Sequence, residues 1–257
     1  AYRDEEAFTR AVALGLLDYL RKSRSSGWVV SLSGGADSAA VTALCSLALK
    51  MAERELGFSG LKSRLLYIDG IEAITDINGL SRAMITTVYQ STQNSGEITR
   101  KAAAAVATAL GSTHHEWSVQ KIVEAYTAIA GTAQKRTLKW STDDLSLQNI
   151  QARARAPGIW MMANIERKLL LATSNRSEAA VGYATMDGDT CGGLSPIAGI
   201  DKAFLLRWLT WLEHTGPDGH GPIPAMKFVN EQSPTAELRP PSRGQTDEDD
   251  LMPYPIL

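Results

Sequence analysis

The sequence predicts an α/β fold, with a doubly wound, mostly parallel sheet flanked by helices. Three observations predict it. Short, nearly all-apolar runs rich in β-branched residues are typical of strands buried on both faces, runs with helical spacing alternate with them, and a glycine-rich turn joins the first such strand to the next helix. With 257 residues, 44% of them hydrophobic, the chain is long enough to bury the core of such a domain.

The first elements are the most clearly marked. An amphipathic helix is expected over residues 4–22, because its apolar residues recur at helical spacing and its acidic residues lie at the start, where the helix dipole favours them. A buried strand over 27–32 follows. The glycine turn then leads into an Ala- and Leu-rich helix over 36–56, which Gly57 is expected to end.

The same alternation continues along the chain. A break at Pro157 is expected because proline interrupts the helical hydrogen bonds, and Asp201 is expected to cap the last strong helix. The further elements expected are strands over 65–68, 85–89, 115–119 and 169–173, and helices over 96–110, 121–130, 144–156, 158–167 and from residue 202 onward.

The C-terminal segment, residues 214–257, has a different composition. It holds most of the ten prolines and an acidic run over 247–250, so it is expected to be loop-rich within a single domain that spans 1–257. The chain begins with Ala1 rather than Met and ends at Leu257 in an apolar stretch with no closing helix. We therefore expect it to be part of a longer protein.

Charge and cysteine content exclude several classes of protein. Lys and Arg number 26 against 28 Asp and Glu, a formal net charge of -2, which disfavours a nucleic-acid partner. Cys45 and Cys191 stand alone, so the sequence offers no zinc knuckle and no disulfide framework. The sequence has neither a run of about 18 apolar residues nor a signal peptide. We expect a cytoplasmic protein with no membrane partner.

The strongest local signal is Ser33-Gly34-Gly35-Ala36-Asp37-Ser38, between the first predicted strand and its helix. Two glycines allow a tight turn, and the helix that follows directs free N–H groups and its positive dipole end at the same point. The loop therefore predicts an anion site rather than a purely steric turn. A carboxylate beside bound phosphates repels them unless it holds a cation, so Asp37 predicts magnesium. The sequence lacks Gly-Lys-Ser/Thr, so this is not the phosphate loop of kinases and GTPases, and it lacks GxGxxG, so it is not the dinucleotide-binding fingerprint.

Ser-Gly-Gly-x-Asp-Ser resembles the pyrophosphate loop of the N-type ATP pyrophosphatases, which split ATP between its α and β phosphates and adenylate a substrate. Within that superfamily, the stretch from Leu171 to Tyr183, Gly188-Asp189, Ser195-Pro196-Ile197 and Lys202 resembles NAD synthetases. The runs over 148–155 and 234–240 resemble them too. The resemblance covers the chain in order and is greatest to the glutamine-dependent branch, whose members carry an amidase domain before the synthetase domain.

The resemblance implies an adenine-nucleotide α-hydrolase-like fold and the ATP-dependent amidation of deamido-NAD to NAD. The nicotinate carboxylate would be adenylated with release of pyrophosphate, and ammonia, free or derived from glutamine, would then displace AMP. It also implies ATP and Mg²⁺ as cofactors, a homodimer or higher homo-oligomer, and an amidase domain as partner in the full-length chain.

The resemblance also assigns roles to individual residues. It implies that Asp37 and Glu178 bind magnesium and act in catalysis with Lys202, although from sequence alone Glu178 also fits a simple helix-start carboxylate and Lys202 a surface charge. The implied contacts to ATP or pyrophosphate are Ser33, Gly34, Gly35, Asp37, Ser38, Thr173, Lys202 and Thr235. The implied contacts to deamido-NAD are Asn149, Arg153, Asp189 and Lys202.

Three expectations stay open at this stage. A spacing of two separates Arg153 from Arg155 on a helix, so at most one of them reaches the substrate. Thr235 lies in the Pro-rich segment, which would order over the substrate as a lid and exclude water. The alternatives to an NAD synthetase are another adenylating enzyme of the superfamily and a non-catalytic nucleotide-binding module.

Overall fold

A computed structural model describes residues 3–232 and 238–239. Its described part contains a sheet of four parallel strands in the order β3-β2-β1-β4. The strands are β1 (Trp28–Ser31), β2 (Ile85–Ser91), β3 (Thr113–Ser118) and β4 (Leu169–Leu171). The chain runs outward from β1 to β3 and then returns to place β4 on the other side of β1. This arrangement confirms the predicted doubly wound fold.

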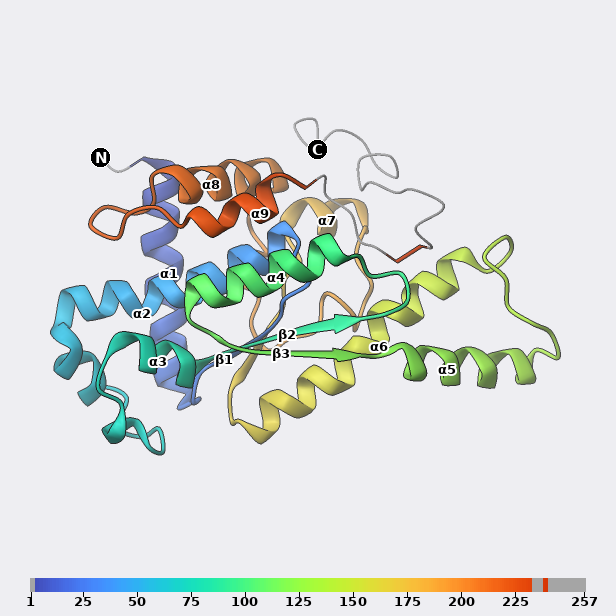
Figure 1. Ribbon diagram of the computed structural model, residues 1–257, viewed down its shortest axis with the longest axis horizontal. Coiled ribbons are helices and arrows are strands. Elements are labelled where there is room, and N and C mark those ends of the chain that lie inside the picture. Colours follow the sequence, from blue (N-terminus) through green and yellow to red (C-terminus); the bar gives the residue numbers. More distant parts are fainter. Residues whose placement is uncertain (1–2, 233–237, 240–257) are drawn as a thin grey trace.

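Helices cover both faces of the sheet (Figure 1). They are α1 (Asp4–Ser23), α2 (Ala36–Ser63), α3 (Ile77–Met84), α4 (Glu97–Leu110), α5 (Gln120–Ala133), α6 (Asp144–Ile165), α7 (Arg176–Val181), α8 (Lys202–His214) and α9 (Lys227–Asn230), with short 3₁₀ turns at Ile71–Ala73 and Pro224–Met226. No helix among these is both long and apolar enough to cross a membrane.

The alternation of side chains along each strand divides the core into two parts. Val29, Val88 and Leu170 point to one face, where they pack with Ile159 and Ala163 of α6. The neighbouring strand residues point to the other face and join the larger core beneath α2, α4 and α8, with α1 packed on α2. Burial on both faces explains why the strand sequences read as nearly continuous apolar runs.

The last strong helix is tied to the first through the core. Trp208 of α8 is fully buried, and its indole Nε1 donates a hydrogen bond of 2.8 Å to the hydroxyl of Thr9 in α1. The ring of Phe8 packs edge-on against Trp208 at 5.2 Å between centroids. These contacts join the middle of α8 to α1.

Two sequence predictions about elements are wrong. Residues 65–68 form turns rather than a strand, although Leu65 and Ile68 are buried. Helix α6 runs without a break through Pro157, which lies exposed in its interior. The proline removes one hydrogen bond, but both halves of the helix are packed: Ala154 lies against Val123 of α5, and Ile159 and Ala163 lie against the sheet. At Gly57, by contrast, the helical geometry is interrupted as predicted, with φ at +68°.

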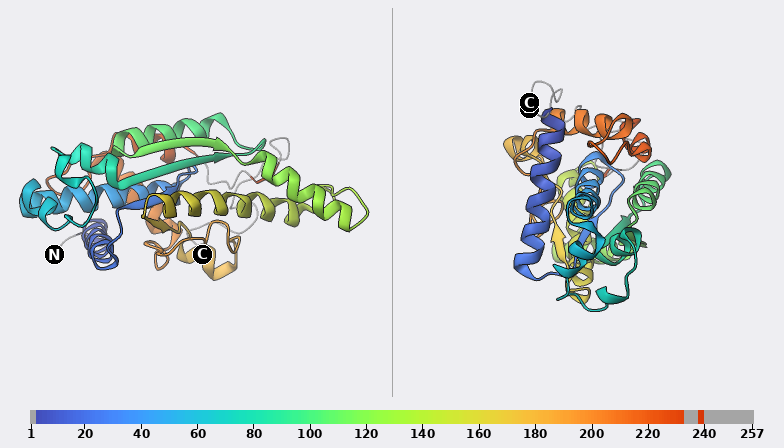
Figure 2. Two further views of the ribbon diagram at one scale, coloured as in Figure 1. Left: turned by 90° about the horizontal axis from the view of Figure 1, so that it is seen from below. Right: turned by 90° about the vertical axis from the view of Figure 1, so that its left-hand side faces the viewer.

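The segment after β3 extends away from the sheet. Helix α5 and the first part of α6 project beyond the carboxyl ends of β2 and β3, as Figures 1 and 2 show. Beyond α8, the described residues form loops, one 3₁₀ turn and the four-residue helix α9, which agrees with the expected loop-rich composition. Most of the expected lid, including Thr235, lies outside the described residues.

Candidate active site

The phosphate loop leaves the carboxyl end of β1 and starts α2. Gly35 is the residue before the first turn of α2, and the backbone N–H groups of that turn face the carboxyl edge of the sheet. The hydroxyl of Ser38 accepts the backbone N–H of Ser33 at 3.2 Å and lies 3.1 Å from the hydroxyl of Ser33. The predicted loop residues therefore form one closed turn that presents donors to an anion.

Gly34 is required at its position in this turn. Its φ is +86°, and a Cβ there would lie 2.1 Å from the carbonyl oxygen of Thr99, far inside van der Waals contact. Gly35 is different, because a Cβ there would meet only the Ser33 hydroxyl, at 3.4 Å. The first glycine thus allows the close approach of the loop to α4, and the second leaves open the space in front of the helix.

The second part of the site follows β4, the strand that pairs with β1. Asn175 begins α7 with a capping box, since its side chain accepts the backbone N–H of Glu178 and the Glu178 carboxylate accepts the backbone N–H of Asn175. The same Asn175 donates its side-chain amide to Asp37 at 2.8 Å. Asn175 is buried, so this contact fixes the start of α7 against the phosphate loop.

The third part of the site is the first residue of α8. Asp201 caps that helix by accepting the backbone N–H of Phe204, and Ser177 accepts the backbone N–H of Lys202. Lys202 is only 2% exposed, and its ammonium contacts the Asp37 carboxylate directly and lies 3.8 Å from Glu178. The alternative of a solvated surface lysine, which the sequence alone left open, does not describe this residue.

These contacts bring Asp37, Glu178 and Lys202 together from three distant parts of the chain. Burial and the nearby Asp37 carboxylate raise the pKa of Glu178 to about 8, while the Lys202 ammonium opposes the rise. Two carboxylates thus share one buried ammonium. Glu178 therefore binds a proton more readily than an exposed carboxylate does.

A cavity of about 480 Å³ opens beside this cluster, a size typical of small-molecule sites. The loop residues Ser33, Gly35, Asp37 and Ser38 line one side, with Thr173, Glu178 and Lys202. Asn149 and Asp189, the predicted deamido-NAD contacts, line the same cavity. There the Asn149 side chain accepts the Thr185 hydroxyl at 2.9 Å, and Asp189 accepts the Thr185 backbone N–H at 2.7 Å.

The two arginines of α6 have different surroundings, and Arg153, the one predicted to contact deamido-NAD, is not the one that lines the cavity. Arg155 lines the cavity, where its guanidinium donates to the backbone carbonyls of Gln90 and Gln151. Arg153 is exposed, does not line the cavity, and donates to the carbonyl of Met186.

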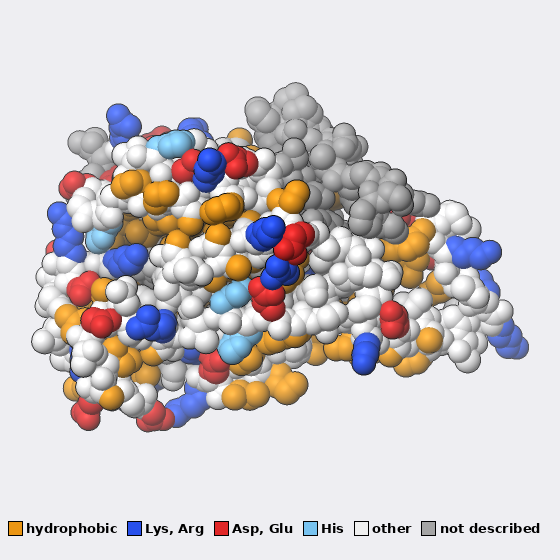
Figure 3. Space-filling view, in the orientation of Figure 1, with side chains coloured by type: hydrophobic (Ala, Val, Ile, Leu, Met, Phe, Trp, Pro, Cys, Tyr) orange, Lys and Arg blue, Asp and Glu red, His pale blue; other side chains and the backbone are white. Residues whose placement is uncertain are grey.

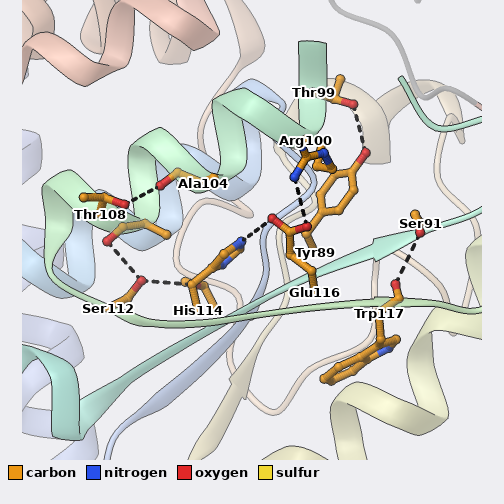
Figure 4. A network of polar contacts seen from close by, with 12 residues as sticks. Tyr89, Ser91, Thr99, Arg100, Ala104, Thr108, Ser112, His114, Glu116 and Trp117 are labelled. Atoms are coloured by element: carbon orange, nitrogen blue, oxygen red, sulfur yellow. Dashed lines mark hydrogen bonds and ion pairs between the residues drawn. The ribbon is translucent and has the colours of Figure 1, made fainter. Parts of the chain in front are cut away.

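The residues that hold the others in place were not predicted from the sequence. Asn175 lies in the stretch that resembles NAD synthetases. Its position before α7 indicated a helix cap, but nothing in the sequence indicated that its side chain also contacts Asp37. Tyr89 and Thr99 also line the cavity, and their hydroxyls lie 3.1 Å apart (Figure 4). Cys191 lines it as well, and burial raises the pKa of its thiol to about 11, so it is not a reactive thiolate.

The donor set suits a hard cation bound together with a substrate. Among the described residues, no group of three or more His, Cys, Asp or Glu residues converges to hold a metal unaided. The cluster supplies the carboxylates of Asp37 and Glu178, and Mg²⁺ is commonly bound by one or two carboxylates together with phosphate oxygens. The residues present therefore fit magnesium that arrives with a phosphorylated substrate.

Comparison with known proteins places the chain in a family. The family model for NAD synthase matches residues 8–257. A glutamine-dependent NAD(+) synthetase of Aquifex aeolicus is 34% identical over 255 residues, which are 99% of this chain and 37% of that protein. A second relative of the same description, from Oryza sativa, is 33% identical and is matched over 36% of its length.

Solved structures agree with this comparison. The glutamine-dependent NAD(+) synthetase of Cytophaga hutchinsonii superposes with a TM-score of 0.82 at 42% identity, over 92% of this chain and 41% of that one. The enzyme of Acinetobacter baumannii, solved with ADP, shares the fold with a TM-score of 0.68 at 20% identity, over 93% and 38%. This chain spans well under half the length of these relatives. It belongs to the NAD synthase family.

Proposed function

We propose that this chain catalyses the ATP-dependent amidation of deamido-NAD to NAD. The observation that carries the proposal is the convergence of Asp37, Glu178 and Lys202 beside a phosphate loop, at the carboxyl edge of the sheet. The chain that builds this site belongs to the NAD synthase family. Open α/β sheets bind ligands at this edge. The site offers charge stabilisation, and among the described residues that line the cavity we identify no activated nucleophile that would form a covalent enzyme intermediate.

The reaction needs two displacements. An oxygen of the nicotinate carboxylate attacks the α-phosphorus of ATP, the bond from that phosphorus to the bridging oxygen breaks, and pyrophosphate leaves. Ammonia then attacks the acyl carbon, the bond from carbon to the AMP oxygen breaks, and a proton is lost to give the amide. The loop N–H groups would hold the phosphates, and the Lys202 ammonium would offset the negative charge that develops in both steps.

We propose Asp37 and Glu178 as the residues that hold Mg²⁺. The ion, when bound, would neutralise phosphate charge and favour departure of pyrophosphate. The buried Lys202 ammonium keeps the two carboxylates close together before substrate binds. Ser33 and Ser38, on the same loop, would orient the phosphates, and Asn149 and Asp189 the deamido-NAD.

The direct test is incubation of the chain with ATP, Mg²⁺, deamido-NAD and ammonium. We expect NAD and AMP in equal amounts. ADP as the product, or no NAD at saturating ammonium, would reject the proposal.

Asp37→Asn and Glu178→Gln should each lower kcat by about 100-fold or more, as loss of a group that stabilises transition-state charge does.

The nitrogen donor is a separate question. We propose that glutamine supplies the ammonia through an amidase domain in the full-length protein, because the curated relatives are described as glutamine-dependent and are far longer than this chain. Glutamine should then support NAD formation by the full-length protein, whereas this chain alone should require ammonium. ATP binding without release of pyrophosphate would instead favour a non-catalytic nucleotide-binding module.

A further inference from the structure

Residues Leu238 and Arg239 are held against the cavity by a set of side chains to which nothing above assigns a role. We propose that Asn94, Gln151 and Asp144 anchor these two residues, and that the anchor is a positioning device for deamido-NAD because it sets where Leu238 forms part of the cavity wall. This inference rests on the proposed function for its substrate, but the anchor itself is visible in the contacts.

The centre of the anchor is the carbonyl oxygen of Leu238. It accepts the side-chain amides of Gln151 at 2.6 Å and of Asn94 at 3.1 Å. Asn94 and Gln151 are only 5% and 3% exposed, and they come from the loop after β2 and from α6. Two buried amides directed at one backbone carbonyl form a specific receptor for that peptide group, because each would be costly to leave without a partner.

The orientation of the Gln151 side chain is fixed by its other hydrogen bonds. Its oxygen accepts the Asn94 amide at 2.9 Å and the Thr92 hydroxyl at 3.2 Å. Its nitrogen donates to the Leu147 carbonyl of α6 at 2.9 Å as well as to Leu238. Both donors and both acceptor positions of the carboxamide are used, so the group that receives Leu238 is pre-organised.

A second contact holds the next residue. The guanidinium of Arg239 donates to the Asp144 carboxylate, with distances of 3.1 Å from Nε and 2.9 Å from Nη2 to Oδ2. Asp144 also accepts the side-chain amide of Gln148, which lines the cavity. Because Asp144, Gln148 and Gln151 follow one another at spacings of four and three, they lie on one face of α6.

The anchor acts on the site through Leu238. Leu238 lines the same cavity as Asn149 of α6, which is proposed to orient deamido-NAD, and its carbonyl is held by Gln151, two residues further along that helix. The phosphate loop lines the cavity from a different element, α2. Loss of the anchor is therefore expected to weaken deamido-NAD binding more than ATP binding.

The test uses Arg239→Ala and Gln151→Met. Each should raise the KM for deamido-NAD about tenfold, as expected for loss of one well-formed hydrogen-bonded contact, with the KM for ATP and kcat changed less than about twofold. The exchanged-charge variant Asp144→Arg/Arg239→Asp should recover most of the loss caused by either single change. Arg136→Ala is the matched control, because it removes a similar ion pair, Arg136–Asp143, that does not contact Leu238.

Hydrogen exchange supplies a readout that needs no turnover. The peptide that contains Leu238 and Arg239 should exchange faster in Arg239→Ala and Gln151→Met than in wild type or Arg136→Ala. Unchanged exchange in both variants would overturn the anchor, and faster exchange with an unchanged KM would overturn its positioning role. If the wild-type chain makes no NAD, the proposed function fails, and the dissociation constant of deamido-NAD then replaces KM in the same comparison.

Discussion

At the scale of single residues, the site depends on one buried charge. Lys202 is 2% exposed, and its ammonium is the group that compensates Asp37 and Glu178. Removal of one partner from a buried ionic cluster leaves the remaining charges without compensation, which is more costly than exchange of the whole cluster for apolar groups. Lys202 should therefore matter to folding as well as to the reaction.

Lys202→Met should lower the free energy of unfolding by about 3 kcal/mol, because the side chain keeps its volume but the Asp37 carboxylate loses its buried counter-ion. Urea denaturation at neutral pH measures the change. The control is Lys227→Met, which removes an exposed pair with Glu231 and should cost less than about 1 kcal/mol. Equal stability of the two variants would contradict the role of Lys202 in the cluster.

The two glycines of the phosphate loop should respond differently to a methyl group. Gly34→Ala places a Cβ 2.1 Å from the Thr99 carbonyl oxygen at a positive φ, so it should cost about 2 kcal/mol or more and weaken ATP binding. Gly35→Ala meets only the Ser33 hydroxyl at 3.4 Å and should cost less than about 1 kcal/mol. Thermal unfolding with and without ATP compares them. A larger cost at Gly35 would be inconsistent with this geometry.

Much of the site could be predicted residue by residue, because its chemistry lies in short motifs. The loop over 33–38 follows from a buried strand, two glycines and a helix start, and the structure forms that turn. The burial of Lys202 could not be predicted in this way, since it depends on how α8 packs against α1 and α2. The choice between Arg153 and Arg155 depends likewise on the rotation of α6 against the sheet.

At the scale of secondary structure, periodicity predicted the elements that are packed along their whole length. Strands β1 and β2 and helices α1 and α4 lie where expected. Residues 65–68 were predicted as a strand but form turns in which Leu65 and Ile68 are buried. A short apolar run of this kind reads the same in the sequence whether it is buried in a strand or in a turn. The unbroken α6 shows that packing of its first half on α5 and of its second half on the sheet outweighs one hydrogen bond lost at Pro157.

Strand β3 and helix α4 carry a titratable contact at the outer edge of the sheet. The ring of His114 faces Glu116, which Arg100 contacts from α4 (Figure 4). The ring Nδ1 of His114 lies 2.9 Å from the hydroxyl of Thr87 in β2. Burial lowers the pKa of His114, and the Glu116 charge only partly opposes this.

This shift predicts how stability depends on pH. The folded state binds the His114 proton less tightly than the unfolded chain does. The stability that neutral His114 allows is therefore fully present above the ordinary histidine pKa of about 6.5, and the free energy of unfolding decreases as the pH falls below that value. His114→Gln should reduce the fall in unfolding free energy between pH 7.5 and pH 5. His214→Gln, at a side chain 67% exposed, is the control and should leave the slope as in wild type. A slope equal in all three proteins would refute the assignment.

At the scale of the whole molecule, the fold brings together residues that are far apart in the sequence. Parallel pairing of β1 with β4 places the loops that follow them side by side, and the start of α8 lies against both. Figure 3 shows that the face over α4 and α8 carries charges of both signs rather than one extended basic patch, which agrees with the near-neutral composition. Within the described residues, Asp37, Glu178 and Lys202 form a buried cluster of titratable groups beside the phosphate loop.

The central claim is that this site activates a carboxylate by adenylation. It is tested most directly by deamido-NAD labelled with ¹⁸O in the nicotinate carboxylate, incubated with the chain, ATP, Mg²⁺ and ammonium. Because the carboxylate oxygen bonded to phosphorus stays with AMP when ammonia displaces it, the account predicts one ¹⁸O atom in AMP for each NAD formed, detected by mass spectrometry. Label in inorganic phosphate with ADP as the other product, or AMP free of label, would contradict it.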